Sequence, residues 1–274
     1  GATTPLGTNP ASGAAITVST GASVEFAGTV DTNSGLAITP NVTFLGDVTI
    51  GAIDVGAVAT TFDGNVVLDG VTMSAADAIT FGDDPATDSV TLQTGAVTVE
   101  TTANDGNLLF NSTVTGDFDL TATANGDGTV TFNNDVTVGG TGSALTITAA
   151  ALDLAANVDL NTATPPADGD ISLTVDGLTL GGTNTVNAGG ANVQLTPRSV
   201  AFTIEFGDVD TALSTDVYYS SAWSSFTAGS FTVGDTAHTG DITMTGVGAA
   251  PYALAVVNGG TGDITLSAGY SSAD

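Results

Sequence analysis

Residues 130–149, VTFNNDVTVGGTGSALTITA, carry the pattern that decides the fold of this chain. Bulky apolar residues alternate with threonine in residues 130–132 (VTF), 136–138 (VTV) and 145–147 (LTI). A period of two is typical of a β-strand with one buried face. The segment between the last two, residues 139–142 (GGTG), supplies the positive φ angles that tight turns need. We therefore predict short strands joined by turns.

The same alternation recurs along most of the chain, and its spacing indicates a repeat. Apolar positions from Val71 to Val193 return at nearly even intervals. A period of about 20 residues that holds about three short strands is typical of a solenoid, in which stacked coils share one core. The Ala-rich stretch 149–157 keeps the strand pattern at residues 152–154 (LDL), and we interpret it as strand. The predicted fold is an all-β parallel β-helix, or β-solenoid, with about 20 residues per coil.

Two regions depart from the repeat. Residues 1–15 are rich in Gly, Pro, Ala and Thr and predict an extended linker or lead-in strand. Residues 16–274 then form a single solenoid domain, with an irregular interruption at 208–226. That interruption contains four aromatic residues, which are either a contact platform or a bridge across the core: Tyr218, Tyr219, Trp223 and Phe226.

Composition excludes several classes of function. The chain has 29 Asp+Glu against one Lys+Arg, a formal net charge of -28. Without a basic patch it is not expected to bind nucleic acid or anionic membranes, and the lone cation, Arg198, is expected to pair with a nearby carboxylate. The absence of Cys removes disulfides and thiolate metal sites. No apolar run approaches the roughly 20 residues of a membrane-spanning helix.

Three phrases carry a family resemblance: residues 193–197 (VQLTP), residues 130–149, and the long run 226–269 that begins FTAGSFTVGD. In these phrases the chain resembles the repeat regions of filamentous-haemagglutinin-like exoproteins, bacterial surface adhesins exported by two-partner secretion. The resemblance implies a right-handed parallel β-helix, an extracellular or cell-surface location, and an adhesive or structural role. From the residues themselves we assign no catalytic residue and no cofactor other than the calcium considered below.

The residues available for catalysis are few. His238, the one histidine, lies in a predicted turn at residues 236–240 (TAHTG), where we expect it to be solvated. A Ser/His/Asp triad around it is formally available because Ser and Asp are plentiful. Parallel β-helices also include polysaccharide-cleaving enzymes, so a glycosidase that uses two carboxylates stays open as an alternative.

Calcium is the candidate metal, since acidic turns offer the hard oxygen ligands that this ion prefers. None of these turns matches a complete calcium motif, and solvated acidic turns are the other interpretation. The candidate ligands are Asp83, Asp84 and Asp88 in one turn, and Asp168 and Asp170 in another.

Thr-x-Thr pairs raise a further alternative, an ice-binding solenoid. They begin at Thr121, Thr129, Thr146 and Thr162, and their uneven spacing along the sequence does not match the predicted coil. Outward threonine is also favoured by β propensity alone. This alternative therefore ranks last.

Taken together, these features predict a non-enzymatic extracellular protein, a shaft segment or subunit of a bacterial surface fibre or adhesin. A solenoid without capped ends exposes strand edges, so the expected partner is a second copy that stacks end to end. Surface glycans of a host or neighbouring cell are the other expected partners.

Overall fold

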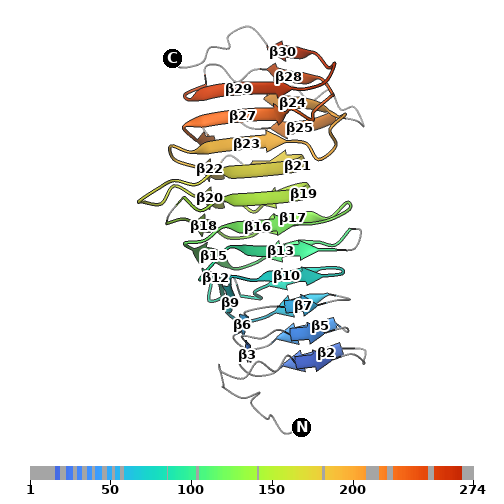
Figure 1. The fold of residues 1–274 in the computed structure, drawn as a ribbon, viewed down its shortest axis with the longest axis vertical. Helices are drawn as coiled ribbons and strands as arrows, with labels where there is room; N and C mark the ends of the chain where they lie inside the picture. Colours follow the sequence, from blue (N-terminus) through green and yellow to red (C-terminus); the bar gives the residue numbers. More distant parts are fainter. Residues whose placement is uncertain are drawn as a thin grey trace.

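The fold is seen in a computed structural model, which describes residues 16–18, 23–26, 30–32, 36–38, 41–44, 48–50, 53–55, 59–84, 86–102, 105–140, 142–180, 183–207, 216–220, 225–245 and 250–266. These residues form an all-β stack of parallel strands, with the first strands at one end and the last at the other (Figure 1). Residues 1–15, the predicted linker, lie outside the described residues. No helix among the described residues is long and apolar enough to cross a membrane.

The strands lie on three faces, and every pairing is parallel. Most coils contribute a strand to each face, but among the described residues the last coils contribute none to face 3. Face 1 consists of β1 (Ile16–Val18), β4 (Leu36–Ile38), β7 (Ile53–Val55), β10 (Thr72–Ala75), β13 (Val97–Thr101), β16 (Leu120–Thr123), the first parts of β19 (Leu145–Leu154) and β21 (Ile171–Thr179), β23 (Asn192–Thr196), β27 (Ser230–Asp235) and β29 (Ala253–Asn258). Face 2 consists of β2 (Ser23–Phe26), β5 (Asn41–Phe44), β8 (Thr60–Phe62), β11 (Ile79–Phe81), β14 (Leu108–Phe110), β17 (Thr129–Phe132), the second parts of β19 and β21, β25 (Asp216–Ser220), β24 (Thr203–Gly207), β28 (Ile242–Thr245) and β30 (Ile264–Leu266). Face 3 consists of β3 (Val30–Thr32), β6 (Val48–Ile50), β9 (Val66–Asp69), β12 (Ser89–Gln93), β15 (Thr113–Gly116), β18 (Val136–Val138), β20 (Asp159–Asn161), β22 (Thr185–Asn187) and β26 (Phe226–Thr227).

The β-solenoid prediction is confirmed, but the coil is longer than predicted, at about 24 residues. Along face 1, paired residues are separated by 20, 17 and 20 positions from β1 to β10, and by 26, 23, 25, 26 and 22 from β10 to β23. Apart from β19 and β21, which each cross two faces, no strand is longer than six residues, so most of the added residues lie in the connections. The strand predicted within residues 149–157 is present as part of β19, which runs across two faces.

The core is built from columns of identical or similar side chains. Six phenylalanines stack along face 2, with ring centroids 4.8 to 5.1 Å apart and rings within 19° of parallel: Phe26, Phe44, Phe62, Phe81, Phe110 and Phe132. Five of the six rings are fully buried. The separation equals the spacing of adjacent strands, so each ring contacts the ring of the coil above and below.

Glycine allows the corners of successive coils to approach closely. A Cβ atom on Gly128 would lie 2.2 Å from the carbonyl oxygen of Gly106, and one on Gly169 would lie 1.8 Å from that of Ser143. Both distances are far shorter than a non-bonded contact. The Gly-rich turns are therefore required by backbone-to-backbone packing as well as by turn geometry.

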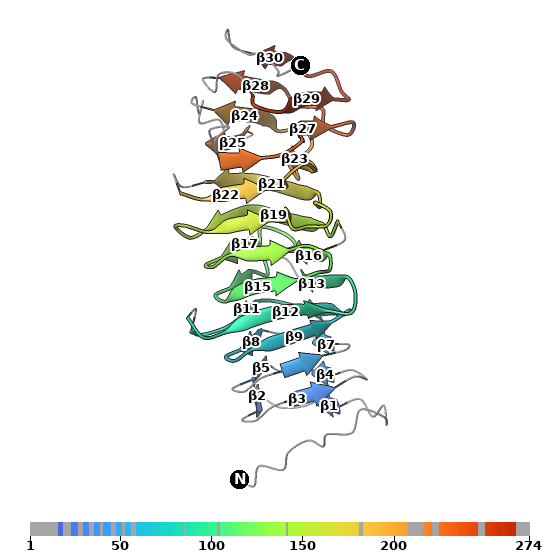
Figure 2. The ribbon, with the colours of Figure 1, turned by 90° about the vertical axis from the view of Figure 1, so that its left-hand side faces the viewer.

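The predicted interruption contains a reversal in strand order. Strand β25 follows β24 in the sequence, yet it lies between β21 and β24 on face 2. The chain therefore passes through face 2 twice between β23 and β26, all in the parallel sense. This extra passage explains why Leu195 and Val233, which pair on face 1, lie so far apart in the sequence. The turned view in Figure 2 shows that the stack continues beyond this region through β27, β28, β29 and β30.

Candidate functional site

The first predicted calcium group closes the connection between β11 and β12. The backbone N–H groups of Asp83 and Asp84 donate to Oδ2 of Asp88 at 3.0 and 2.9 Å, and the N–H of Ala86 donates to Oδ1 of Asp84 at 3.0 Å. These carboxylates therefore act as hydrogen-bond acceptors that hold the turn.

The second predicted group links one coil to the next. Oδ2 of Asp168 accepts from the N–H of Gly190 at 2.7 Å, and Oδ1 of Asp170 accepts from the N–H of Asn192 at 2.9 Å. The two groups lie on different coils and do not come together. Across the described ranges, no three His, Asp or Glu side chains gather where they could hold a metal ion. Calcium at either turn stays a proposal that a titration would test.

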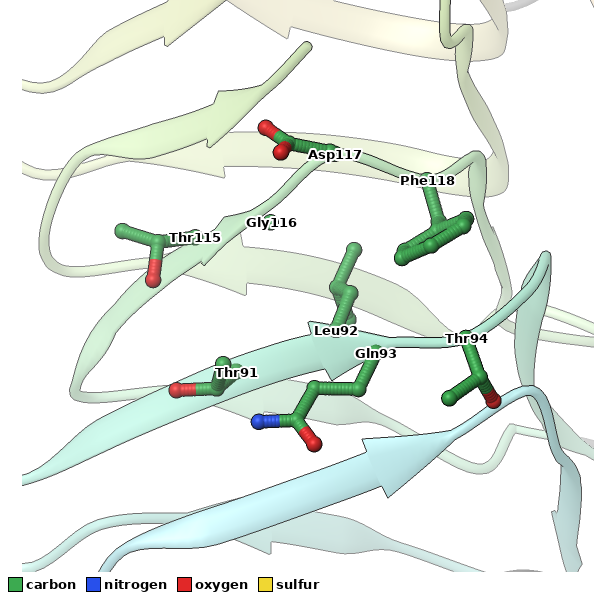
Figure 3. Close-up of a pocket in the computed structure, with 8 residues that line it drawn as sticks. All are labelled: Thr91, Leu92, Gln93, Thr94, Thr115, Gly116, Asp117 and Phe118. Atoms are coloured by element: carbon green, nitrogen blue, oxygen red, sulfur yellow. The ribbon is translucent and has the colours of Figure 1, made fainter. Parts of the chain in front are cut away.

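A shallow groove lies at the corner between faces 3 and 1, where β12 and β15 end (Figure 3). Its volume is about 590 Å³. The lining residues are Thr91, Leu92, Gln93, Thr94, Thr115, Gly116, Asp117 and Phe118. The ring of Phe118 points along the groove toward Thr94, while Thr91 and Gln93 point outward from β12. An aromatic ring beside amide and hydroxyl groups is a combination that can contact a sugar.

A smaller groove of about 350 Å³ adjoins the first and shares Asp117 and Phe118 with it. Asp119 lines it too, so this corner holds two carboxylates, as the glycosidase alternative requires. One oxygen of Asp119 is already engaged, because Oδ1 accepts from the N–H of Ala144 at 2.8 Å. The corner brings Phe118 together with these two aspartates, and the alternation of apolar and polar residues in the sequence does not indicate where that corner lies.

Of the four predicted interface aromatics, one has a described side chain. Phe226 is 3% exposed and packs edge to face against Phe231, with ring centroids 4.8 Å apart. Phe226 therefore belongs to the core, and its proposed role in a surface platform was wrong. The backbones of Tyr218 and Tyr219 pair within β25, whereas their side chains and all of Trp223 lie outside the described residues.

His238 is buried, contrary to prediction. The side chain is 0% exposed, and neither Nδ1 nor Nε2 has a hydrogen-bond partner among the described residues. The next corner covers it, since the carbonyl oxygen of His238 accepts from the N–H groups of Gly259 and Gly260 at 3.1 and 2.9 Å. Because no hydroxyl or carboxylate of the described residues reaches the ring, this part of the chain forms no Ser/His/Asp triad.

The partner of Arg198 also differs from the predicted one, a nearby carboxylate. Nη1 of Arg198 donates to the carbonyl oxygen of Gly126, 72 positions earlier in the sequence. The neighbouring Ser199 binds a carboxylate instead, with its N–H and Oγ each 2.9 Å from an oxygen of Asp176. Arg198 therefore ties together corners that lie several coils apart.

The last strand exposes the apolar columns of the core. On β30, Ile264 and Leu266 are 46% and 47% exposed, although their partners on β28, Ile242 and Met244, are fully buried. The apolar surface at this end therefore continues the core columns but has no further strand on it among the described residues.

Comparison of the chain with family models, with curated proteins and with solved structures finds no match. The fold alone places it in a class, that of parallel β-solenoids with three faces per coil.

Proposed function

We propose that this chain is a non-enzymatic shaft segment or subunit of a bacterial surface fibre or adhesin, located outside the cell and assembled end to end. Its resemblance to filamentous-haemagglutinin-like repeats supports the location. Its construction supports the structural role, because the turn carboxylates described above serve as hydrogen-bond acceptors between or within coils, and the grooves are shallow.

The observation that carries the proposal is the exposed end of the core at β30. Strand edges with unpaired N–H and C=O groups recruit further strands. A second copy that places its first coil on β30 would continue the parallel ladder and cover Ile264 and Leu266. Burying the exposed half of each side chain contributes about 1 kcal/mol. Because such a contact joins different ends of two copies, it does not close, and repetition gives a filament.

The test is sedimentation velocity and electron microscopy of the full chain over a range of concentrations. We expect concentration-dependent species that become longer at constant width. The variants Ile264→Asp and Leu266→Asp should shift the distribution to single rods, because each buries a charge in the contact. Thr265→Asp is the matched control, since it adds the same charge to the same strand at the intervening position.

Three outcomes would contradict the proposal. Single rods at every concentration, or equal loss of assembly in all three variants, would rule out end-to-end stacking through β30. The chain could also release reducing ends from polysaccharides and lose this activity when Asp117 or Asp119 is changed to Asn. That result would favour the glycosidase alternative over the structural role.

A further inference from the structure

Face 1 carries two adjacent columns of hydroxyl side chains. On β16, β19 and β21 the residues alternate between the core and the outside, and each strand presents two hydroxyl residues outward. Register places Thr121 beside Thr146 and Ser172, and Thr123 beside Thr148 and Thr174. We call these six residues the hydroxyl array: Thr121, Thr123, Thr146, Thr148, Ser172 and Thr174.

The register corrects an argument made from the sequence. Thr121 and Thr146 pair directly and occupy equivalent positions on successive coils. The pair at Thr129 and Thr131 lies on face 2, where its partners are Ala151 and Asp153. The irregular offsets along the sequence arose because pairs from different faces were compared, so they do not count against an ordered threonine surface.

The array has regular geometry. Its residues alternate with fully buried ones, such as Ala122, Ile147 and Leu173, so the hydroxyl side chains point away from the core. Adjacent strands are about 4.8 Å apart, and alternate residues along a strand are about 6.7 Å apart. Strands β19 and β21 run one above the other across the middle of the stack (Figure 1), so the array forms part of an extended surface.

The array itself is free of charge and of internal hydrogen bonds. None of its six hydroxyl groups has a partner among the residues that the structure describes. Elsewhere hydroxyl groups are used within the fold, as where Oγ1 of Thr185 donates to Asp159 at 2.5 Å and Oγ of Ser143 donates to the carbonyl of Asp117 at 2.8 Å. The carboxylate next in register is Glu100, one strand away, whose Oε1 accepts from Ser74 at 2.6 Å.

β propensity explains why threonine faces outward, and face 3 has one such column at Thr91, Thr115 and Thr137. It does not explain why two hydroxyl columns lie side by side on face 1. On face 2 the outward position changes from Leu109 to Thr131 to Asp153 on successive strands. On the array, by contrast, all six outward positions are uncharged, so no carboxylate within the array would orient water that binds there. In a chain of net charge -28, such a patch is distinctive.

We infer that the hydroxyl array binds ice. Each threonine presents a hydroxyl group that both donates and accepts hydrogen bonds, next to a methyl group that does neither. Branching at Cβ restricts χ1, so the side chains are ordered before they bind. Water held at regular intervals over such a surface costs little entropy to immobilise, because it is already partly ordered. A growing ice face is the ligand that needs this combination of regular spacing, neutrality and mixed polarity. The inference does not rest on end-to-end assembly.

The experiment measures inhibition of ice recrystallisation and the gap between the melting and growth temperatures of single ice crystals. We expect the unmodified chain to slow recrystallisation and to shape crystals. Thr146→Tyr and Thr148→Tyr should each abolish the effect, because a ring at the centre of the array lifts the ice face from its neighbours. Thr131→Tyr is the matched control, an outward threonine on face 2, and should retain the full effect. Circular dichroism melting of each variant shows whether the fold is intact.

Three results would overturn the inference. The first is an unmodified chain that leaves ice growth unchanged. The second is an equal loss in Thr131→Tyr and Thr146→Tyr when all variants are folded. The third is a chain that has no effect on ice but sediments with insoluble cellulose or chitin, when Thr146→Tyr abolishes that sedimentation. This result would assign the array to binding a crystalline polysaccharide.

Discussion

At the turns, aspartate carboxylates take the place of missing backbone acceptors. Oδ1 of Asp241 accepts from the N–H of Asp263 at 2.7 Å, and Oδ1 of Asp105 accepts from the N–H of Asp127 at 2.9 Å, each one coil later. At a corner the backbone leaves the strand direction, so an N–H group there has no carbonyl opposite it and needs another partner. A carboxylate makes a stronger acceptor than a neutral group. The acidity of the chain is therefore, in part, a consequence of how its corners are held.

One carboxylate lies where its charge is unfavourable. Burial raises the pKa of Asp63 above its usual range, and the nearby charges of Asp83, Asp88 and Glu25 raise it further. A raised pKa in the folded state means that folding disfavours the ionised form. The charge on Asp63 therefore destabilises the fold at neutral pH, and this destabilisation disappears as pH falls through the raised pKa.

Asp63→Asn should accordingly raise the melting temperature at pH 7, and the gain should shrink toward zero as the pH is lowered below the pKa of the carboxyl group. Thermal melting of the variant and the unmodified chain at a series of pH values measures the difference. Asp153→Asn, an exposed residue of β19, controls for the loss of one charge. A gain that persists unchanged into acid would show that the charge of Asp63 is not its source.

At the scale of strands, the phenylalanine column joins six successive coils of face 2 through ring-to-ring contacts. Phe110 lies within it, with Phe81 on one side and Phe132 on the other, each with its centroid 4.8 Å away. Removing this ring leaves a cavity that closes poorly, because both neighbours are fixed by their own coils. Ring-to-ring packing in this column therefore holds each coil against the next along the core.

Phe110→Ala should lower the free energy of unfolding by about 3–5 kcal/mol, and Phe110→Leu by about 1 kcal/mol. Leu109→Ala, at the outward neighbour in β14, should cost less than about 1 kcal/mol. Denaturant unfolding followed by circular dichroism measures all three. Equal losses for Phe110→Ala and Leu109→Ala would mean that the ring column does not stabilise the stack.

The strands could be predicted from the sequence because alternation is local, whereas coil length could not. Phe62, Phe81 and Phe110 each end a strand of similar form, yet the interval from Phe81 to Phe110 is much longer than that from Phe62 to Phe81. The connections vary in length, so neither this column nor the hydroxyl array shows a fixed period. His238 was misplaced for a related reason, since the corner at Gly259 that covers it belongs to the next coil. Contacts between coils become predictable once the register is known.

On the scale of the whole molecule, charge and shape act together. A net charge of -28 is distributed over a long, narrow stack with few cations to offset it (Figures 1 and 2). Side-by-side contact between two such rods is repulsive, and the repulsion extends over about 10 Å at 0.1 M salt. End-to-end contact places fewer charges next to each other, so repulsion favours growth in length over growth in width.

Millimolar calcium should therefore cause lateral bundling, because a divalent cation can bridge carboxylates of two rods, and sodium at matched ionic strength should not. Acidification toward the isoelectric point near 4.1 should have the same effect by removing charge. Light scattering follows bundling during each titration, and electron microscopy shows whether the bundles consist of parallel rods. Asp168→Asn combined with Asp170→Asn tests whether that turn contributes, since the amides keep their acceptor oxygens but lose both charges. If scattering stays constant with calcium and between pH 7 and pH 4, charge repulsion does not control the lateral association of this protein.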